Sequence, residues 1–370
     1  MKTVCHVISG YFRNDARVFK RQCLSLKQEG FKVSILTNDG EPDDVLDGIK
    51  IYSCVKKWPR WKTLLFASYQ FQKEAIEINA DIYQLHSPEL LPLAIKLKKL
   101  GKKVVYDAHE DMSAHILEKD WLPKFSRRFI SIFISAYMNW VYKRIDEIVS
   151  PHLHVIKKIN NDISKGILVA NFPLIQQLDS EIIQNIKSRK PVVCYSGTVY
   201  NYSNQENIIN ALSSTKDVSY EVAGVIDDSY KNALLSLPCN DRVNFHGRIN
   251  QLELRDLYLK SLIGIVIYDY KLNLGYNLGS FGTNKIFEYM EAGLPIICTD
   301  YILWQEIIEE YKCGVCVKPG DIESIASAIN LINNDRDLAT KMGNNSRKAA
   351  IEKFNWKTEK QKYVKVFHNL

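Results

Sequence analysis

The sequence predicts an α/β protein of two doubly wound domains, each built on a parallel sheet with helices on both faces. Three observations point to this fold class. Short runs rich in β-branched residues alternate with amphipathic helical runs, the alternation occurs in two separate series, and a length of 370 residues suits two or three domains. A single small module is excluded.

The first series of expected strands opens the chain. Its first strand, residues 3–8, precedes a helix that carries Phe19, Cys23 and Leu26 on one face and ends at Gly30. Further strands are expected at residues 32–36, 81–85, 103–107, 146–149 and 167–169. This order is the βαβ pattern of a parallel sheet.

The second series follows a polar stretch over residues 176–190. Its strands are expected at residues 191–197, 218–223, 243–245, 263–267, 295–298 and 314–317. We place the domain boundary in the polar stretch. The expected parts are an N-terminal domain over residues 1–180, a C-terminal domain over residues 181–352, and a last helix over residues 353–370 that packs back towards the N-terminal domain.

Composition and charge indicate a folded cytoplasmic protein. The chain is 46% hydrophobic, and its net charge of +7 does not concentrate into the basic tract of a nucleic-acid binder. Eight cysteines are scattered through the expected strands and helices, which is typical of reduced thiols in a core. The first ten residues resemble a strand more than a signal peptide.

Residues at the strand ends are the first candidates for a site, because doubly wound sheets bind ligands at the carboxyl ends of their strands. In the first domain the candidates at the strand ends or along the cleft are Gly10, Asp15, Arg17, His86, His109 and Glu110. Asp15 has the alternative role of capping the first helix. Without further information, an ordinary loop residue is the better interpretation of His109, and His86 occupies a similar strand end.

A loop of small residues in the second domain is the strongest candidate for an anion site. Gly282, Thr283 and Asn284 lead into a short helix, whose first N–H groups and dipole favour phosphate. Lys285 adds a positive charge, and Glu288 lies one turn further on the same face, where its carboxylate can accept hydrogen bonds from two ribose hydroxyls. An ordinary surface Lys–Glu pair is the alternative.

The segment from Lys285 to Pro295 resembles the donor-nucleotide motif of GT-B glycosyltransferases, most closely the retaining family 4 group. Other fragments fall in the order of that family: Asp15-Ala-Arg17, Leu85-His-Ser-Pro-Glu-Leu-Leu-Pro92, Val105-Tyr-Asp-Ala-His-Glu110, Asn171-Phe-Pro173, Tyr195-Ser-Gly197, Phe245-His-Gly247 and Phe354-Asn-Trp356. The resemblance implies two Rossmann-like domains that face across a cleft, with the nucleotide sugar held mainly by the C-terminal one.

The resemblance also implies roles for single residues. Glu288 would contact the ribose and Lys285 the diphosphate, while Gly197 and Thr198 would bring the backbone close to the phosphates. His109 would face the transferred sugar, and His86 and Glu110 would be secondary candidates for contact with the acceptor. Catalysis would depend on His109 and Lys285, and the leaving phosphate would help to deprotonate the acceptor, so that no carboxylate nucleophile is needed.

Two departures from the family pattern affect the donor site. Ser280 stands where the family often has a glutamate, and the loop that begins at Gly197 lacks the usual arginine and lysine. Lys285 must then carry more of the phosphate charge, helped by Arg248 at its own strand end. No acidic DxD motif follows an expected strand, so we expect a metal-independent reaction without a cofactor beyond the nucleoside diphosphate sugar.

An aromatic segment from Trp121 to Arg144 raises the question of membrane contact. Its uncharged core, residues 129–142, is too short to span a bilayer, which takes roughly 20 residues. The segment either packs on the first domain's sheet or lies on an anionic membrane surface, with residues 56–62 as a second contact.

The predicted function is a cytoplasmic, retaining glycosyltransferase that moves a sugar from a nucleoside diphosphate to a saccharide or lipid-linked saccharide acceptor in surface polysaccharide or glycan biosynthesis. The alternatives are a nucleotide-sugar epimerase of the same fold and a non-catalytic nucleotide-sugar or glycan-binding protein. No nucleic-acid partner is expected. The nucleoside base, the sugar, the acceptor and the linkage depend on the shapes of the side chains in the cleft, and the spacing of motifs in the sequence does not encode those shapes.

Overall fold

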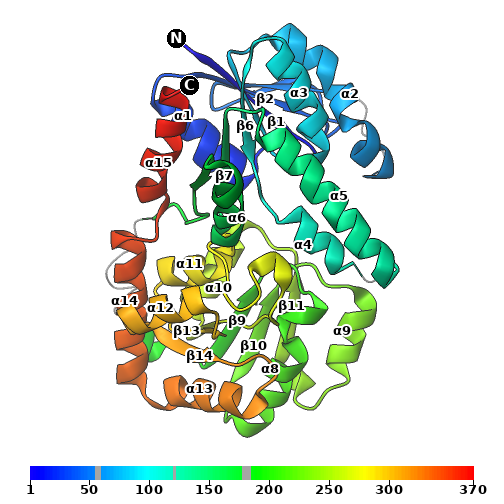
Figure 1. Ribbon diagram of the computed structural model, residues 1–370. Coiled ribbons are helices and arrows are strands. Elements are labelled where there is room, and N and C mark those ends of the chain that lie inside the picture. Colours follow the sequence, from blue (N-terminus) through cyan, green and yellow to red (C-terminus); the bar gives the residue numbers. More distant parts are fainter. Residues whose placement is uncertain (55–59, 120–121, 177–184) are drawn as a thin grey trace. The chain divides into compact units, whose positions relative to one another are not determined.

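The computed structural model describes residues 1–54, 60–119, 122–176 and 185–370, with the backbone alone for residues 60–65 (Figure 1). The chain divides into two compact units. The first comprises Met1–Asn171 and Trp356–Leu370, and the second comprises Phe172–Asn355. Each unit contains one sheet covered by helices, which confirms the predicted fold class.

The sheet of the first unit has the strand order β3-β4-β2-β1-β5-β6-β7-β8. Its strands are β1 (Thr3–Ile8), β2 (Lys32–Thr37), β3 (Asp44–Leu46), β4 (Ile49–Ser53), β5 (Ile82–Leu85), β6 (Lys103–Asp107), β7 (Glu147–Ser150) and β8 (Gly166–Leu168). All pairs are parallel except β3 with β4. Neither strand of this edge hairpin was predicted: β3 is short and largely exposed, whereas β4 alternates between buried and more exposed residues and was overlooked.

Helices cover both faces of this sheet. They are η1 (Ala16–Cys23, a π-helix), α1 (Leu24–Gln28), α2 (Arg60–Ile78), η2 (Pro88–Leu90), α3 (Leu91–Lys99), α4 (Met112–Leu117), α5 (Lys124–Tyr142), α6 (Leu153–Ile163) and α15 (Trp356–His368). One core cluster joins the sheet to α2, α3, α5 and α6, and the other joins it to η1, α1 and α15.

The last helix, α15, belongs to the first unit and lies beside α1 (Figure 1). Trp356, Tyr363 and Phe367 are buried in the same cluster as the first strand. The indole N–H of Trp356 donates to Ser25 Oγ (2.9 Å), and the Tyr363 hydroxyl donates to Gln84 Oε1 (2.5 Å). The chain therefore returns to its N-terminal sheet after completing the second unit.

The sheet of the second unit is parallel throughout, with the order β11-β10-β9-β12-β13-β14. Its strands are β9 (Val192–Ser196), β10 (Ser219–Ala223), β11 (Val243–Gly247), β12 (Ile263–Val266), β13 (Ile296–Thr299) and β14 (Gly314–Val317). The strand order reverses between β9 and β12. That reversal is the place where doubly wound sheets bind ligands.

The connections of the second unit are helical. They are η3 (Asn185–Ser188), η4 (Asn201–Ser203), α8 (Gln205–Ala211), η5 (Leu212–Ser214), α9 (Asp228–Leu235), η6 (Asn240–Arg242), α10 (Gln251–Lys260), η7 (Leu272–Leu274), α11 (Asn284–Glu291), α12 (Ile302–Tyr311), α13 (Ile322–Asn334) and α14 (Arg336–Glu352). Helix α11 begins directly after the predicted anion-binding loop.

Candidate active site

Three glycines lie at the carboxyl ends of neighbouring strands in the second unit. Gly197, Gly224 and Gly247 each have a positive φ. The N–H of Gly197 donates to the carbonyl of Ala223, and the N–H of Gly224 donates to that of Gly247, both at 2.7 Å. A side-chain carbon on Gly224 would lie 1.9 Å from the Gly197 carbonyl oxygen. Only glycine allows the backbone loops to approach this closely.

Lys285, in the first turn of α11, reaches the loop after β9. Its ammonium group donates to the Tyr268 hydroxyl (2.7 Å) and lies 5.2 Å from the centre of the Tyr195 ring. Tyr195 belongs to β9 and Tyr268 follows β12, so Lys285 lies where the strand order reverses. In the described part of the chain no carboxylate forms an ion pair with Lys285. Its charge is therefore available to an anionic ligand.

Glu288 lies one helical turn beyond Lys285 and is held by Tyr258 of α10. The Tyr258 Oη atom is 2.9 Å from Glu288 Oε2 and 2.6 Å from Ser196 Oγ. Burial raises the pKa of Tyr258, and the charge of Glu288 raises it further, so the phenol stays protonated and donates to the carboxylate. The second oxygen of a carboxylate held in this way can accept hydrogen bonds from vicinal hydroxyls.

The loop before α11 is closed by Ser280. Its hydroxyl accepts a hydrogen bond from the N–H of Gly282 (2.8 Å), and its carbonyl accepts one from the Trp304 indole (3.1 Å). Ser280 is fully buried and so supports the turn. Thr283 precedes α11 without capping it by its side chain, and Asn284 is the first helical residue. The first N–H groups of α11 thus receive no cap from Thr283, which suits an anion.

Thr198 and Arg248 lie at strand ends on the surface of the second unit. Both side chains are exposed, and the Thr198 carbonyl accepts a hydrogen bond from the Tyr195 hydroxyl (2.9 Å). Strand β10 separates β11, which precedes Arg248, from β9. Two strand spacings make roughly 10 Å, so the backbone of Arg248 lies well away from that of Gly197. A phosphate contact by Arg248 stays a prediction.

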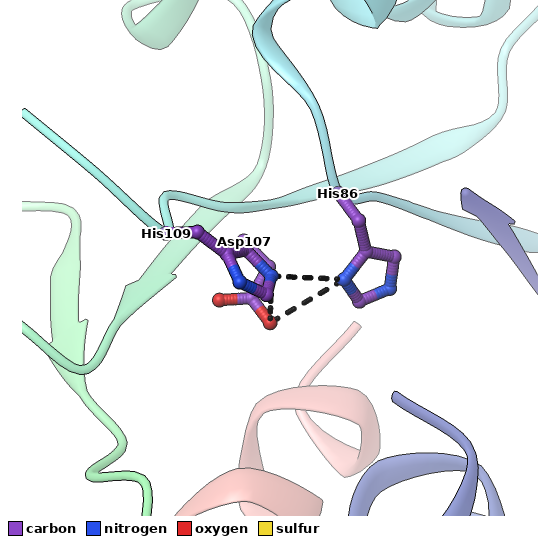
Figure 2. Close-up of side chains that lie close together, drawn as sticks. All are labelled: His86, Asp107 and His109. Carbon is purple, nitrogen blue, oxygen red and sulfur yellow. Dashed lines mark hydrogen bonds and ion pairs between the residues drawn. The ribbon is translucent and has the colours of Figure 1, made fainter. Parts of the chain in front are cut away.

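In the first unit, His86, Asp107 and His109 come together at the carboxyl ends of β5 and β6 (Figure 2). His109 Nε2 lies 3.3 Å from Asp107 Oδ2 and 3.4 Å from His86 Nδ1, while His86 Nδ1 lies 3.5 Å from the same carboxylate oxygen. Asp107 and His86 are fully buried, and the His109 side chain is 17% exposed. Of the three, His109 is the one that reaches the surface.

Asp107 is the centre of this cluster. Arg17 donates to both of its oxygens, at 3.1 Å from Nε and 2.9 Å from Nη2, and Gln22 donates to Oδ2 at 2.6 Å. Burial by itself would raise the pKa of Asp107. The charge of Arg17, followed by that of His109, outweighs burial and holds the pKa well below its usual range. Asp107 is therefore an ionised carboxylate.

The three side chains have the composition of a metal site but not its electrostatics. Their nearest ligand atoms lie within 4.8 Å of one another. However, the Asp107 carboxylate already receives two hydrogen bonds from Arg17 and one from Gln22. The buried Arg17 guanidinium, 2.9 Å from this carboxylate, would repel a cation bound there. These residues do not fit a resident metal ion. The cluster is better described as a network that orients His109.

The neighbouring candidates have structural partners. The Asp15 carboxylate accepts the N–H groups of Arg17 (2.8 Å) and Val18 (2.9 Å) and so caps η1. Arg17 is buried with Asp107 and does not line a surface. Glu110 pairs with His115 at 2.7 Å, and the hydrogen bond from His115 lowers the pKa of Glu110.

Two further groups flank the His109 loop. Gly10 is exposed, with a φ of 76°, and its N–H donates to Asn38 Oδ1 at 3.3 Å. His152 Nε2 lies 2.6 Å from the His109 carbonyl. Burial lowers the pKa of His152 from 6.5 to about 4, so this imidazole is neutral at pH 7 and donates its proton to the carbonyl.

Two family models together match most of the chain. The model for "Glycosyltransferase Family 4" matches residues 16–161, and the model for "Glycosyl transferases group 1" matches residues 177–349. The chain is a GT-B glycosyltransferase. The Bacillus subtilis (strain 168) protein named "Putative glycosyltransferase EpsD" is 22% identical to this enzyme over 353 residues, 88% of this chain and 86% of EpsD.

Solved structures share the fold of this glycosyltransferase. TarM of S. aureus, in a complex with fondaparinux, alpha-GlcNAc-glycerol and UDP, superposes with a TM-score of 0.75 at 11% identity, over 99% of this chain and 100% of TarM. Anabaena HepE in complex with UDP-glucose superposes with a TM-score of 0.72 at 13% identity, over all of both chains. At these identities the likeness shows the fold alone.

Sequence reasoning missed several residues of the candidate site. Tyr258 and Tyr268, which hold Glu288 and Lys285, lie in an ordinary amphipathic helix and after an apolar strand. No local signal separates them from core tyrosines. Gln22, a donor to Asp107, likewise lies within the first helix. Their roles depend on contacts between elements that are distant in sequence.

Proposed function

We propose that this glycosyltransferase moves a sugar from a nucleoside diphosphate to a hydroxyl of a saccharide acceptor, with retention at the anomeric carbon. The acceptor class includes lipid-linked saccharides of surface polysaccharide or glycan assembly. The observation that carries the proposal is the pair formed by Lys285 and Glu288. An available ammonium lies beside a glycine loop at the strand reversal, and a carboxylate one turn away is fixed by Tyr258.

Each end of a ribose-diphosphate group has a partner in this arrangement. The Glu288 carboxylate accepts hydrogen bonds from the two ribose hydroxyls. The ammonium of Lys285 and the first N–H groups of α11 face the phosphates, with Gly197 and Thr198 allowing close backbone approach. TarM was solved with UDP and HepE with UDP-glucose, and both share the fold, which supports a uridine nucleotide as the first donor to test.

The proposed reaction is a substitution at the anomeric carbon. The bond from that carbon to the leaving phosphate oxygen breaks, and the acceptor oxygen bonds to the same face of the sugar. The acceptor proton passes to the leaving phosphate. Lys285 stabilises the charge that builds on the diphosphate, and this fixed charge lowers the barrier. Neither a carboxylate nucleophile nor a metal ion takes part in the proposed step.

His109 is the proposed contact to the transferred sugar. Its Nε2 atom lies 3.3 Å from the ionised Asp107, so Nε2 carries a proton that it donates to this carboxylate. The other ring nitrogen, Nδ1, remains for a hydrogen bond with a sugar hydroxyl. His86 and Arg17 act through Asp107 and are positioning residues. Eight free cysteines support the proposed cytoplasmic location.

The test compares binding and turnover in two variants. We expect UDP and UDP-sugars to raise the melting temperature of the unaltered chain, and Lys285→Ala to abolish this shift. His109→Ala should keep the shift for UDP and lose sugar transfer. Lys260→Ala removes an exposed lysine at the end of α10 and is the matched control, with no expected effect.

Donor binding that survives Lys285→Ala would overturn this proposal. So would either of two outcomes across a panel of nucleoside diphosphate sugars and saccharide acceptors. A sugar epimerised in the absence of acceptor would identify an epimerase, and a sugar bound without any turnover would identify a non-catalytic binding protein.

A further inference from the structure

Helix α5 has two apolar faces, and only one of them is packed against the protein. Its buried side chains are Ser131, Met138, Val141 and Tyr142. Another set of large hydrophobic side chains faces solvent: Phe125 (73% exposed), Phe129 (72%), Ile132 (60%), Phe133 (74%) and Trp140 (44%). Five such residues on one helix form a continuous patch, and patches of this kind mark interaction sites.

The spacing places this exposed set on a single stripe. At about 100° per residue, the five side chains fall within a sector of roughly 100°, and the buried set lies on the opposite side of the helix. The exposed side chains are therefore not the margin of the buried face of α5. Core contacts of α5 are already supplied by the other face, which packs on α3, α4 and α6.

The charges that α5 itself carries have one sign, although the exposed carboxylate of Asp162 on α6 accepts a hydrogen bond from Asn139 of α5 (3.0 Å). Lys124 and Arg128 are exposed at the start of the helix, and Lys143 and Arg144 are exposed at its end. The sequence from residue 121 to 145 contains no acidic residue. The Arg144 guanidinium lies 4.0 Å from the centre of the Trp140 ring, so one cation is held directly against the aromatic stripe.

We propose that α5 docks this enzyme on an anionic membrane surface, lying in the plane of the interface. An aromatic stripe flanked by cations is the pattern of an interfacial helix, in which rings enter the headgroup region and cations face anionic lipid. Among the described residues no helix is long and apolar enough to cross a bilayer. Of the other residues considered for this contact, Trp121 and residues 56–59 lie outside the described residues, and residues 60–62 form the backbone of the first turn of α2.

This inference concerns where the enzyme works and does not depend on the donor or the acceptor. A membrane position would bring the enzyme to a lipid-linked acceptor, but docking holds equally for a soluble one. The two proposals can therefore fail separately. Transfer to a soluble saccharide tests the function, and lipid binding tests the surface.

Vesicle co-flotation of the full chain tests the docking. We expect the chain to float with vesicles of equal parts phosphatidylglycerol and phosphatidylcholine, and much less with phosphatidylcholine alone. The double variant Phe129→Ser, Phe133→Ser should lower the apparent partition constant by roughly 10-fold or more, because two aromatic rings no longer enter the interface. Added salt should weaken binding of the unaltered chain.

Leu252→Ser is the matched control, because Leu252 is 76% exposed on α10 of the other unit and lies outside the stripe. This variant should float as the unaltered chain does. Circular dichroism and transfer to a soluble acceptor confirm that each variant is folded and active. The charge variant Lys124→Gln, Arg128→Gln should bind anionic vesicles more weakly and lose part of the salt dependence.

Absence of flotation with anionic vesicles would overturn the proposal, as would flotation that Phe129→Ser, Phe133→Ser leaves unchanged. A third contrary outcome is a dimer. If sedimentation shows concentration-dependent association that the same double variant abolishes, without any flotation, the stripe binds a second copy of the chain and not a membrane.

Discussion

The ammonium group of Lys285 occupies the space that a side chain at Gly197 would need. A carbon added to Gly197 would lie 2.8 Å from both Nζ and Cε of Lys285. The lysine tip is flexible and can move, so Gly197→Ala should cost the fold only about 1 kcal/mol, from its positive φ. Moving the lysine should nevertheless weaken UDP binding roughly 10-fold, because one charge-assisted contact worth about 1.4 kcal/mol or more is lost.

Gly320→Ala separates backbone strain from displacement of the lysine. Gly320 also has a positive φ, of 80°, but a side-chain carbon there meets nothing within 4 Å. Calorimetric titration with UDP should give an unchanged dissociation constant for this variant. Equal weakening in both variants would mean that strain, and not Lys285, explains the effect.

The hydroxyl of Tyr258 fixes Glu288, and removing that hydroxyl tests the ribose contact. Tyr258→Phe deletes a hydrogen bond of 2.9 Å to the carboxylate and should raise KM for the donor about 3- to 10-fold, with a smaller change in kcat. Tyr220→Phe is the matched control, because Tyr220 is equally buried but donates to Gln205. If both variants raise KM alike, the effect belongs to general packing.

Much of the fold could be predicted from the sequence, because hydrophobic period and strand spacing are local properties. The parallel strands appear where the pattern places them, except β4, whose residues alternate between buried and more exposed positions but were not recognised as a strand beside the three-residue, largely exposed β3. The turn with positive φ at Asp47 and Gly48 closes the hairpin of β3 and β4. Elsewhere the apolar runs rich in β-branched residues supplied the signal.

The candidate site was only half visible in the sequence. Lys285 and Glu288 lie three residues apart in the sequence, and a helix brings such residues to one face, so their position on a common face could be predicted. Tyr258 is 30 residues from Glu288, and Arg17 is 90 residues from Asp107. Partners so distant meet only through sheet topology, and one sequence does not encode which side chains meet there.

Arg17 and Asp107 should be strongly coupled in stability. Asp107→Asn leaves the Arg17 charge buried without its carboxylate and should lower the free energy of unfolding by about 3 kcal/mol or more. Adding Arg17→Met removes the stranded charge, so the double variant should be less destabilised than the sum of the singles, by about 2 kcal/mol. Urea unfolding of the four proteins measures this coupling.

A surface ion pair provides the comparison for that cycle. Lys353 and Glu310 lie 3.2 Å apart with both side chains about half exposed, and Lys353→Ala should change stability by less than about 1 kcal/mol. If the Arg17 and Asp107 substitutions are simply additive, the buried pair does not act as a unit, and the network that orients His109 loses its physical basis.

His152 should make the first unit sensitive to acid. Burial, followed by the charge of His154, lowers its pKa from 6.5 to about 4. At a pH between about 4 and 6.5, His152 binds a proton in the unfolded chain but not in the folded chain. The stabilising contribution is therefore complete above pH 6.5, is lost as the pH falls towards 4, and amounts to about 3 kcal/mol at most.

His152→Gln tests this dependence, because an amide can still donate to the His109 carbonyl but does not titrate. Melting temperatures between pH 4 and 7 should fall less steeply for this variant than for the unaltered chain. Part of the slope should remain, because burial also lowers the pKa of His86 and of His6. An identical slope with and without His152 would show that this imidazole does not contribute to acid unfolding.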